Sequence, residues 1–131
     1  MVIDASALTA IFADEDDGHS LLARIERASV RAVSPLGLWE ATVALGRIYA
    51  RPIDEVAADL RPFIDRFEIR SLPVTADTTS LALSAFERFG RGRHKASLNF
   101  GDCFAYAAAR QHRLPLLFKG QDFSLTDIEP A

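Results

Sequence analysis

Cysteine is almost absent from this 131-residue sequence, in which Cys103 is the only one. A single cysteine excludes an intrachain disulfide and a cysteine-rich zinc site, and Cys103 itself is expected to fill core volume. The three histidines are scattered along the chain, and no two have metal-ligand spacing. Any metal ion would therefore be held by oxygen ligands, with histidine at most as an addition.

Long apolar runs are also missing. No stretch reaches the roughly 18 apolar residues of a membrane-spanning helix. The N-terminus starts directly with strand-like sequence rather than with a basic region and an apolar signal segment. We therefore expect a soluble, cytoplasmic protein with no membrane partner. A hydrophobic fraction of 49% over this length suits one compact domain with a real core.

Strand patterns and helix patterns alternate along the chain. Strands are expected at 1–3, 30–33, 69–72 and 116–118, with a further short strand at 127–128. Helices are expected at about 6–12, 21–28, 35–50, 52–67, 75–89 and 101–112, and Pro62 predicts a kink or break in the fourth. The acidic run 14–17 is expected to cap the second helix and face solvent. This alternation predicts an α/β fold with a mainly parallel sheet flanked by helices on both faces.

Four acidic residues interrupt apolar segments. Asp4 ends the first strand, Glu40 shares a helix face with apolar neighbours, Asp102 opens an alanine-rich helix, and Asp122 follows the strand at 116–118. Functional groups collect at the carboxyl ends of parallel strands, so three of these acids can converge on one rim. Glu40 reaches the same rim if its helix packs beside the first strand.

Unpaired carboxylates in apolar surroundings are costly, and a shared cation offsets that cost. Carboxylates along an open cleft suit Mg²⁺ or Mn²⁺, which could activate a water for attack on phosphorus. Each acid also has a structural explanation: Asp4 and Asp122 could cap turns, Glu40 could pair with Arg47, and Asp102 could stabilise a helix start whose dipole favours its ionised form. Their joint occurrence favours a metal-dependent hydrolase.

A basic segment precedes Asp102. The net charge of −3 argues against a polyanionic partner, yet the range 88–101 contains no acidic residue. Within it, Arg91, Arg93 and Lys95 could hold RNA phosphates, or could belong to a loop that is merely solvated. Trp39, beside Glu40, is expected to fill core volume, with a place on the wall of the cleft as the alternative.

Three segments resemble known motifs. Residues 2–8, VIDASAL, resemble the opening motif of PIN-domain ribonucleases, and residues 99–107, NFGDCFAYA, resemble the third motif of the VapC toxins within that family. Residues 117–123, LFKGQDF, with TDI at 126–128, are similar to the C-terminal end of those toxins. Together with Glu40, the ordered set spans the chain and is quite specific.

The resemblance implies a three-layer PIN fold, a single PIN domain over residues 1–131, and a Mg²⁺- or Mn²⁺-dependent endoribonuclease toxin neutralised by a VapB-type antitoxin. Carried over by position, Asp4, Glu40, Asp102 and Asp122 match the acidic catalytic and metal-binding site. Ser6 matches a hydroxyl residue that would bind water or phosphate. Asp127 competes with Asp122, which we prefer because it immediately precedes Phe123.

Two other functions are considered. A phosphatase of the aspartyl-phosphate type would need a second Asp two positions after Asp4, where this chain has Ser6. A non-catalytic PIN-like module acting through protein or RNA contacts stays open. Apolar surface on the second and fourth helices could serve an antitoxin or a homodimer interface.

Overall fold

The computed structural model describes residues 1–131 and contains one parallel sheet. Its strands are β1 (Val2–Ile3), β2 (Ala32–Val33), β3 (Arg70–Ser71) and β4 (Leu116–Leu117), in the order β3-β2-β1-β4. All three strand pairs are parallel. Because β1 is central, its carboxyl end is bordered by the ends of β2 and β4. The predicted α/β class and parallel sheet are confirmed.

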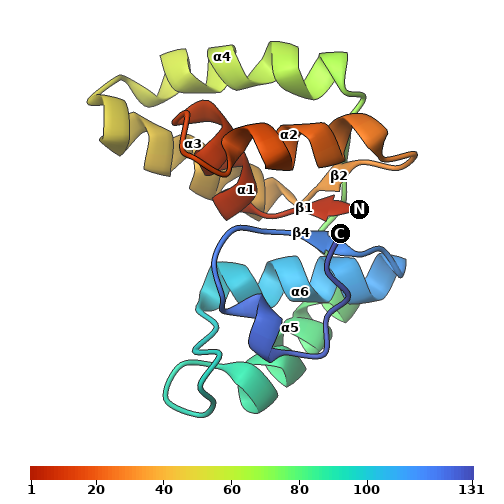
Figure 1. The fold of residues 1–131 in the computed structure, drawn as a ribbon. Helices are drawn as coiled ribbons and strands as arrows, with labels where there is room; N and C mark the ends of the chain where they lie inside the picture. Colours follow the sequence, from red (N-terminus) through yellow and green to blue (C-terminus); the bar gives the residue numbers. More distant parts are fainter.

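Helices cover both faces of the sheet (Figure 1). One face carries α1 (Ala5–Phe12), α2 (Gly18–Arg27), α3 (Pro35–Tyr49) and α4 (Ile53–Arg66). The other carries α5 (Ala76–Phe89), α6 (Phe100–His112) and the short 3₁₀ helix η1 (Phe123–Leu125). The result is the three-layer arrangement that the alternating pattern predicts.

Successive side chains of the short strands point to opposite faces of the sheet, and this divides the core in two. Val2 and Leu116 point into the core formed with α5 and α6, whereas Ile3, Val33 and Leu117 point into the core formed with α1 and α2. Successive side chains of a strand face opposite sides of a sheet, so two buried residues are enough to serve both layers.

Local capping residues start the helices that surround the strand ends. The Ser34 side chain accepts a hydrogen bond from the Gly37 amide at 2.9 Å, and Pro35 occupies the first turn of α3. Thr75 and Asn99 begin α5 and α6 with capping boxes. These starts follow from nearby sequence alone.

One local prediction is wrong, and of the kink or break predicted at Pro62 the break is absent. The segment 127–128 is not a strand, because the chain turns through η1 and forms only an isolated bridge between Leu116 and Pro130. Helix α4 runs unbroken past Pro62. A proline removes one backbone donor, and the burial of Val56 and Leu60 on the inner face holds the remaining turns together.

The apolar surface expected on the second and fourth helices is largely absent. The stripes of α2 and α4 are buried in the protein's own core, and Ile53 is the only large apolar side chain that either helix exposes. An apolar groove instead lies between α5 and α6, lined by Leu83, Phe86 and Phe100 among others. No helix has the length and apolar character needed to cross a bilayer.

Candidate active site

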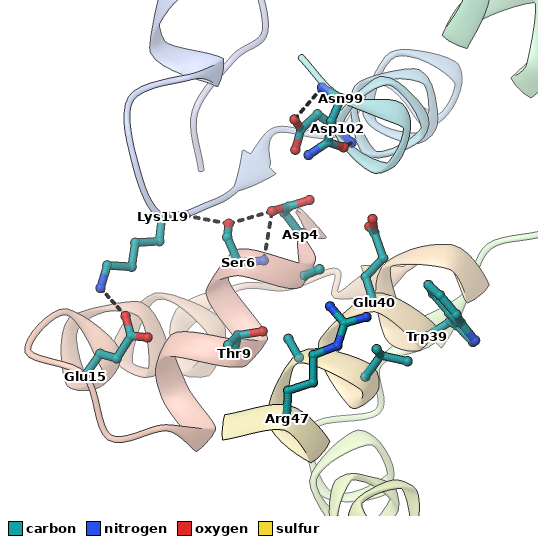
Figure 2. A pocket seen from close by; sticks show the side chains of 13 residues that line it. Asp4, Ser6, Thr9, Glu15, Trp39, Glu40, Arg47, Asn99, Asp102 and Lys119 are labelled. Atoms are coloured by element: carbon teal, nitrogen blue, oxygen red, sulfur yellow. Dashed lines mark hydrogen bonds and ion pairs between the residues drawn. The ribbon is translucent and has the colours of Figure 1, made fainter. Parts of the chain in front are cut away.

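A cleft of about 480 Å³ opens beside the carboxyl ends of β1 and β4. Asp4, Glu40 and Asp102 all line it, and Figure 2 shows their side chains reaching into the same space from three separate elements. The structure therefore brings together three of the four acids singled out by the sequence. Glu40 arrives because α3 packs against both α1 and α6.

Asp4 is the most buried of these acids, with 4% of its surface exposed. It caps α1, and its Oδ2 atom accepts hydrogen bonds from the Ser6 amide at 2.9 Å and the Ser6 hydroxyl at 2.5 Å. Burial raises the pKa of Asp4, and the hydrogen bonds from Ser6 oppose that rise. The Oδ2 atom is thus fixed by two hydrogen bonds from Ser6.

Ser6 links two segments that are far apart in sequence. Its hydroxyl donates to Asp4 and accepts a hydrogen bond from the Lys119 amide at 3.0 Å, just after β4. The hydroxyl proton is therefore already used within the protein. This geometry favours orientation of Asp4 over the phosphate-binding role expected from the sequence.

Glu40 is half-buried on α3, with its carboxylate against Gly101 of α6. A side chain at position 101 would overlap the Glu40 carboxylate, so only glycine allows this approach. Burial raises the pKa of Glu40 to about 7, and the charges of Asp4 and Asp102 contribute to the rise. The mutual effects on pKa reflect the proximity of the three acids.

Asp102 lies in the first turn of α6 and is held by a capping box. Its Oδ2 atom accepts from the Asn99 amide at 2.8 Å, and its own amide donates to the Asn99 side chain at 3.0 Å. Burial raises the pKa of Asp102 to about 6, opposed by the Asn99 amide and reinforced by Asp4 and Asp122. The hydrogen bond at the helix start thus favours the ionised form, and burial outweighs it.

Asp122 and Asp127 have different surroundings. Asp127 accepts hydrogen bonds from the Tyr106 hydroxyl at 2.6 Å and from Arg88 at 2.8 Å, and these contacts lower its pKa. Asp122 is exposed at the start of η1, makes no capping hydrogen bond, and lies near enough for its charge to raise the pKa of Asp102. Asp127 is thus engaged in the fold, whereas Asp122 makes no such contact and is not among the residues that line the cleft.

The donor set suits a divalent cation. Asp4, Glu40 and Asp102 form no ion pair with any basic side chain, although burial makes their charges costly. As the side chains stand, no group of three or more His, Cys, Asp or Glu residues is placed to hold a metal ion by itself. A hard cation that retains several waters needs only a few carboxylates along an open cleft, so these residues fit such an ion.

Two basic residues at the cleft were not predicted as site residues: Lys119 was not singled out, and Arg47 was named only as a possible partner of Glu40, with which it forms no ion pair. Lys119 and Glu15 form an ion pair on one wall, and Arg47 lines the cleft from α3. Lys119 could have been singled out because it directly follows a strand. Glu15 was assigned to solvent with the rest of its acidic run, and its pairing across the fold has no local signal.

The predicted basic residues lie outside the cleft lining, although all three are exposed. Arg93 pairs with Glu87 at 2.8 Å. The Arg91 charge opposes the raised pKa of Asp102, which places it within electrostatic range of the site. Cys103 is buried as expected, and burial raises the pKa of its thiol to about 11, which makes it a poor nucleophile.

Comparison with known proteins places these features in a family. The family described as PIN domain matches residues 1–129. Ribonuclease VapC of Mycolicibacterium smegmatis is 39% identical over 128 residues, covering 98% of this chain and 97% of the relative. Ribonuclease VapC30 of Mycobacterium tuberculosis is 38% identical over 128 residues, covering 98% and 95%.

Solved structures share the fold at lower sequence identity. The crystal structure of Mycobacterium tuberculosis VapC20, described as a sarcin-ricin loop cleaving toxin, superimposes with a TM-score of 0.77 at 19% identity and covers 99% of this chain and 97% of that one. A chain of a toxin-antitoxin complex from Klebsiella pneumoniae gives a TM-score of 0.70 at 17% identity, covering 94% and 89%. Both carry the same arrangement of helices around a sheet.

Proposed function

The chain belongs to the PIN-domain family, among its VapC ribonucleases, and on that premise we propose that Asp4, Glu40 and Asp102 are the catalytic and metal-binding centre at which it cuts RNA. It is an endoribonuclease toxin of this family, and an antitoxin is its partner. Asp122 is proposed as the fourth acid. The observation that carries the assignment is the convergence in one cleft of three carboxylates that form no ion pair with a basic side chain.

PIN-domain nucleases depend on a divalent metal ion, and we propose Mg²⁺ or Mn²⁺ because every candidate ligand is a carboxylate. Such an ion lowers the pKa of a bound water and stabilises charge on phosphate oxygens. Asp4 and Asp102 would hold it through the oxygens that Ser6 and Asn99 leave free. Glu40 would approach from α3, in the position that Gly101 permits.

The nuclease proposal is tested with purified protein freed of its antitoxin, incubated with Mg²⁺ or Mn²⁺. The RNA panel includes a sarcin-ricin loop oligonucleotide, because one structural relative is described as cleaving that loop. We expect cleavage by the wild type, and a loss of roughly 100-fold or more in Asp4→Asn and Asp102→Asn. Asp54→Asn, an exposed acid on α4 outside the cleft, is the control that retains activity.

Equal cleavage by the wild type and both site variants would remove the catalytic assignment. A wild type that cuts no RNA would favour the alternative, a PIN-like module acting through protein or RNA contacts alone. The VapB-type antitoxin is proposed separately, and co-expression with the product of the neighbouring reading frame tests it. Absence of a complex and of any relief from growth arrest would contradict that part.

Three further points belong to the proposal. Residues 1–131 are taken as one PIN domain. A homodimer is supported by the apolar groove between α5 and α6, which a second copy could cover. A cytoplasmic location follows from the substrate, because RNA and newly made antitoxin are found there. Sedimentation equilibrium of the isolated toxin measures directly whether it is a homodimer.

A further inference from the structure

Helix α3 presents a mixed row of side chains to the cleft. Trp39, Val43 and Arg47 follow one another at four-residue intervals, which places them on one helix face, and all three line the cleft with Glu40. The row spans about 12 Å along the helix at 1.5 Å per residue. One wall of the acidic cleft therefore carries an aromatic, an apolar and a cationic group in sequence.

Trp39 does not fill the core. Its surface is 64% exposed, and it lies beside Glu40 at the rim of the cleft (Figure 2). It takes part in none of the aromatic pairs within the protein. An exposed indole next to a nuclease site offers a flat surface on which an unpaired base can stack. The alternative of a cleft-wall position is therefore the one observed.

Arg47 is an unpaired cation in an acidic setting. It is exposed and forms no ion pair, whereas Lys119 in the same cleft is paired with Glu15 and nearby Arg51 is paired with Asp59. In Figure 2 the Arg47 side chain extends from α3 toward the side of the cleft that holds Glu40. A free guanidinium there is available to a phosphate group, which it can bind through two parallel hydrogen bonds.

We propose that this face of α3 is a binding track for single-stranded RNA, in which Trp39 stacks on a base and Arg47 holds a backbone phosphate. The inference rests on the proposed nuclease function, which it extends by naming the substrate groups bound and the residues that bind them. Bases in a duplex have both faces covered by neighbours, so the exposed indole selects unpaired nucleotides. The track would fix the strand across the three carboxylates.

Trp39 is the only tryptophan in the chain, so intrinsic fluorescence reports on this position alone. We would titrate the full-length Asp4→Asn/Asp102→Asn double variant, which should not cut, with a short single-stranded oligonucleotide and with the same strand in a duplex. The expected result is saturable quenching by the single strand and little by the duplex. Affinity measured independently by anisotropy should fall roughly 10-fold with Trp39→Ala, and Trp39→Phe should restore most of it.

Arg47→Gln should weaken binding of all sequences alike and reduce the salt dependence of the affinity by about one phosphate contact. Arg70→Gln is the matched control, because Arg70 is also exposed and unpaired but lies on β3, outside the cleft. Neither substitution removes a buried group, so circular dichroism and thermal melting should match the parent protein.

Unchanged RNA affinity in Trp39→Ala, or no quenching at saturation, would overturn the inference. If the wild type still cuts RNA in that case, the nuclease function stands without the track. If the wild type neither binds nor cuts any RNA, the nuclease function fails first. Loss of antitoxin binding with RNA affinity unchanged would assign this face to a protein partner instead, and would equally overturn the inference.

Discussion

Gly101 contributes to the site by having no side chain. Its backbone is ordinary helix, and the constraint comes from Glu40, whose carboxylate occupies the space that a Cβ atom would fill. The contact brings α3 and α6 together at the cleft and sets how close Glu40 comes to Asp102. A glycine next to a candidate metal ligand is thus explained by packing rather than by backbone freedom.

Gly101→Ala should displace the Glu40 carboxylate and lower the rate of RNA cleavage by roughly 10- to 100-fold, because small misplacements of catalytic groups are costly. Gly37→Ala on α3 is the control: its nearest neighbour would be the Ser34 hydroxyl at 3.4 Å, an ordinary contact. That variant should keep full activity and gain up to about 1 kcal/mol in the free energy of unfolding. Initial rates of RNA cleavage measure the activity, and urea denaturation measures the free energy of unfolding. A fully active Gly101→Ala protein would contradict the packing argument.

The raised pKa values predict how pH acts on the metal-free protein. Glu40 has a pKa of about 7 in the folded state against 4.5 as its ordinary value, so the folded state binds its proton more tightly than the unfolded state. The contribution to stability is therefore greatest at low pH and is lost as pH rises from about 4.5 to about 7. Asp102, with a pKa of about 6, acts in the same direction.

Urea denaturation with a chelator present, at about pH 5 and about pH 7.5, measures this effect. The decrease in the free energy of unfolding between the two pH values should be smaller in Glu40→Gln than in the wild type, which isolates Glu40 from other titrating groups. An identical decrease in both proteins would show that ionisation of Glu40 does not destabilise the folded state.

At the scale of the element, the start of α6 has two tasks. The Asn99 and Asp102 capping box satisfies backbone donors and also holds the Asp102 carboxylate against the cleft. Helix α5 begins with the same device, Thr75 and Thr78, but carries no site acid there. Comparing the capping boxes of α5 and α6 therefore separates the effect of helix capping from the effect of orienting a metal ligand.

Asn99→Ala and Thr75→Ala should each cost about 1 kcal/mol in the free energy of unfolding, because each removes an N-cap. Only Asn99→Ala should also weaken Mn²⁺ binding, by up to roughly 10-fold: the backbone amide at position 99 still donates to the Asp102 carboxylate, but the first turn of α6, which positions both groups, loses its side-chain cap. Isothermal titration calorimetry measures the metal affinity. Equal metal affinity in the two variants would contradict the orienting role of Asn99.

What could be predicted at this scale depends on how local the signal is. The strand endings at Asp4 and the helix start capped by Thr75 follow from adjacent residues, and both were predicted. The ion pair of Lys119 with Glu15 joins residues 104 positions apart, and the hydrogen bond from Lys119 to Ser6 spans 113. Such contacts leave no periodic pattern. The same tertiary packing explains why Pro62 does not break its helix.

At the scale of the whole molecule, the cleft lies on the boundary between the two halves of the core. Asp4 and Glu40 belong to the layer of α1 to α4, whereas Asp102 belongs to the layer of α5 and α6 (Figure 1). A cation bound by all three would link the two layers across the sheet edge. A ligand that binds only the folded state stabilises it by RT ln(1 + L/Kd), which increases with the ligand concentration L.

Mn²⁺ at about 100 times its dissociation constant should therefore add about 2.7 kcal/mol to the free energy of unfolding at neutral pH. Thermal melts with and without the ion measure this gain, independently of catalysis. The gain should disappear in the Asp4→Asn/Asp102→Asn protein and persist in Asp54→Asn. A gain that survives in the double variant would place the ion elsewhere.

The strand order β3-β2-β1-β4 has a consequence for biosynthesis. Strand β1 is synthesised before its neighbour β4, and the hydrogen bond from Lys119 to Ser6 also depends on residues that follow β4 in the chain. A nascent chain that still lacks α6 and β4 has Asp4 and Glu40 but neither Asp102 nor Lys119, which α6 and the segment after β4 contribute to the cleft. The ribonuclease should thus remain inert until α6 and β4 have been made, and the antitoxin needs to be present only when β4 joins the sheet.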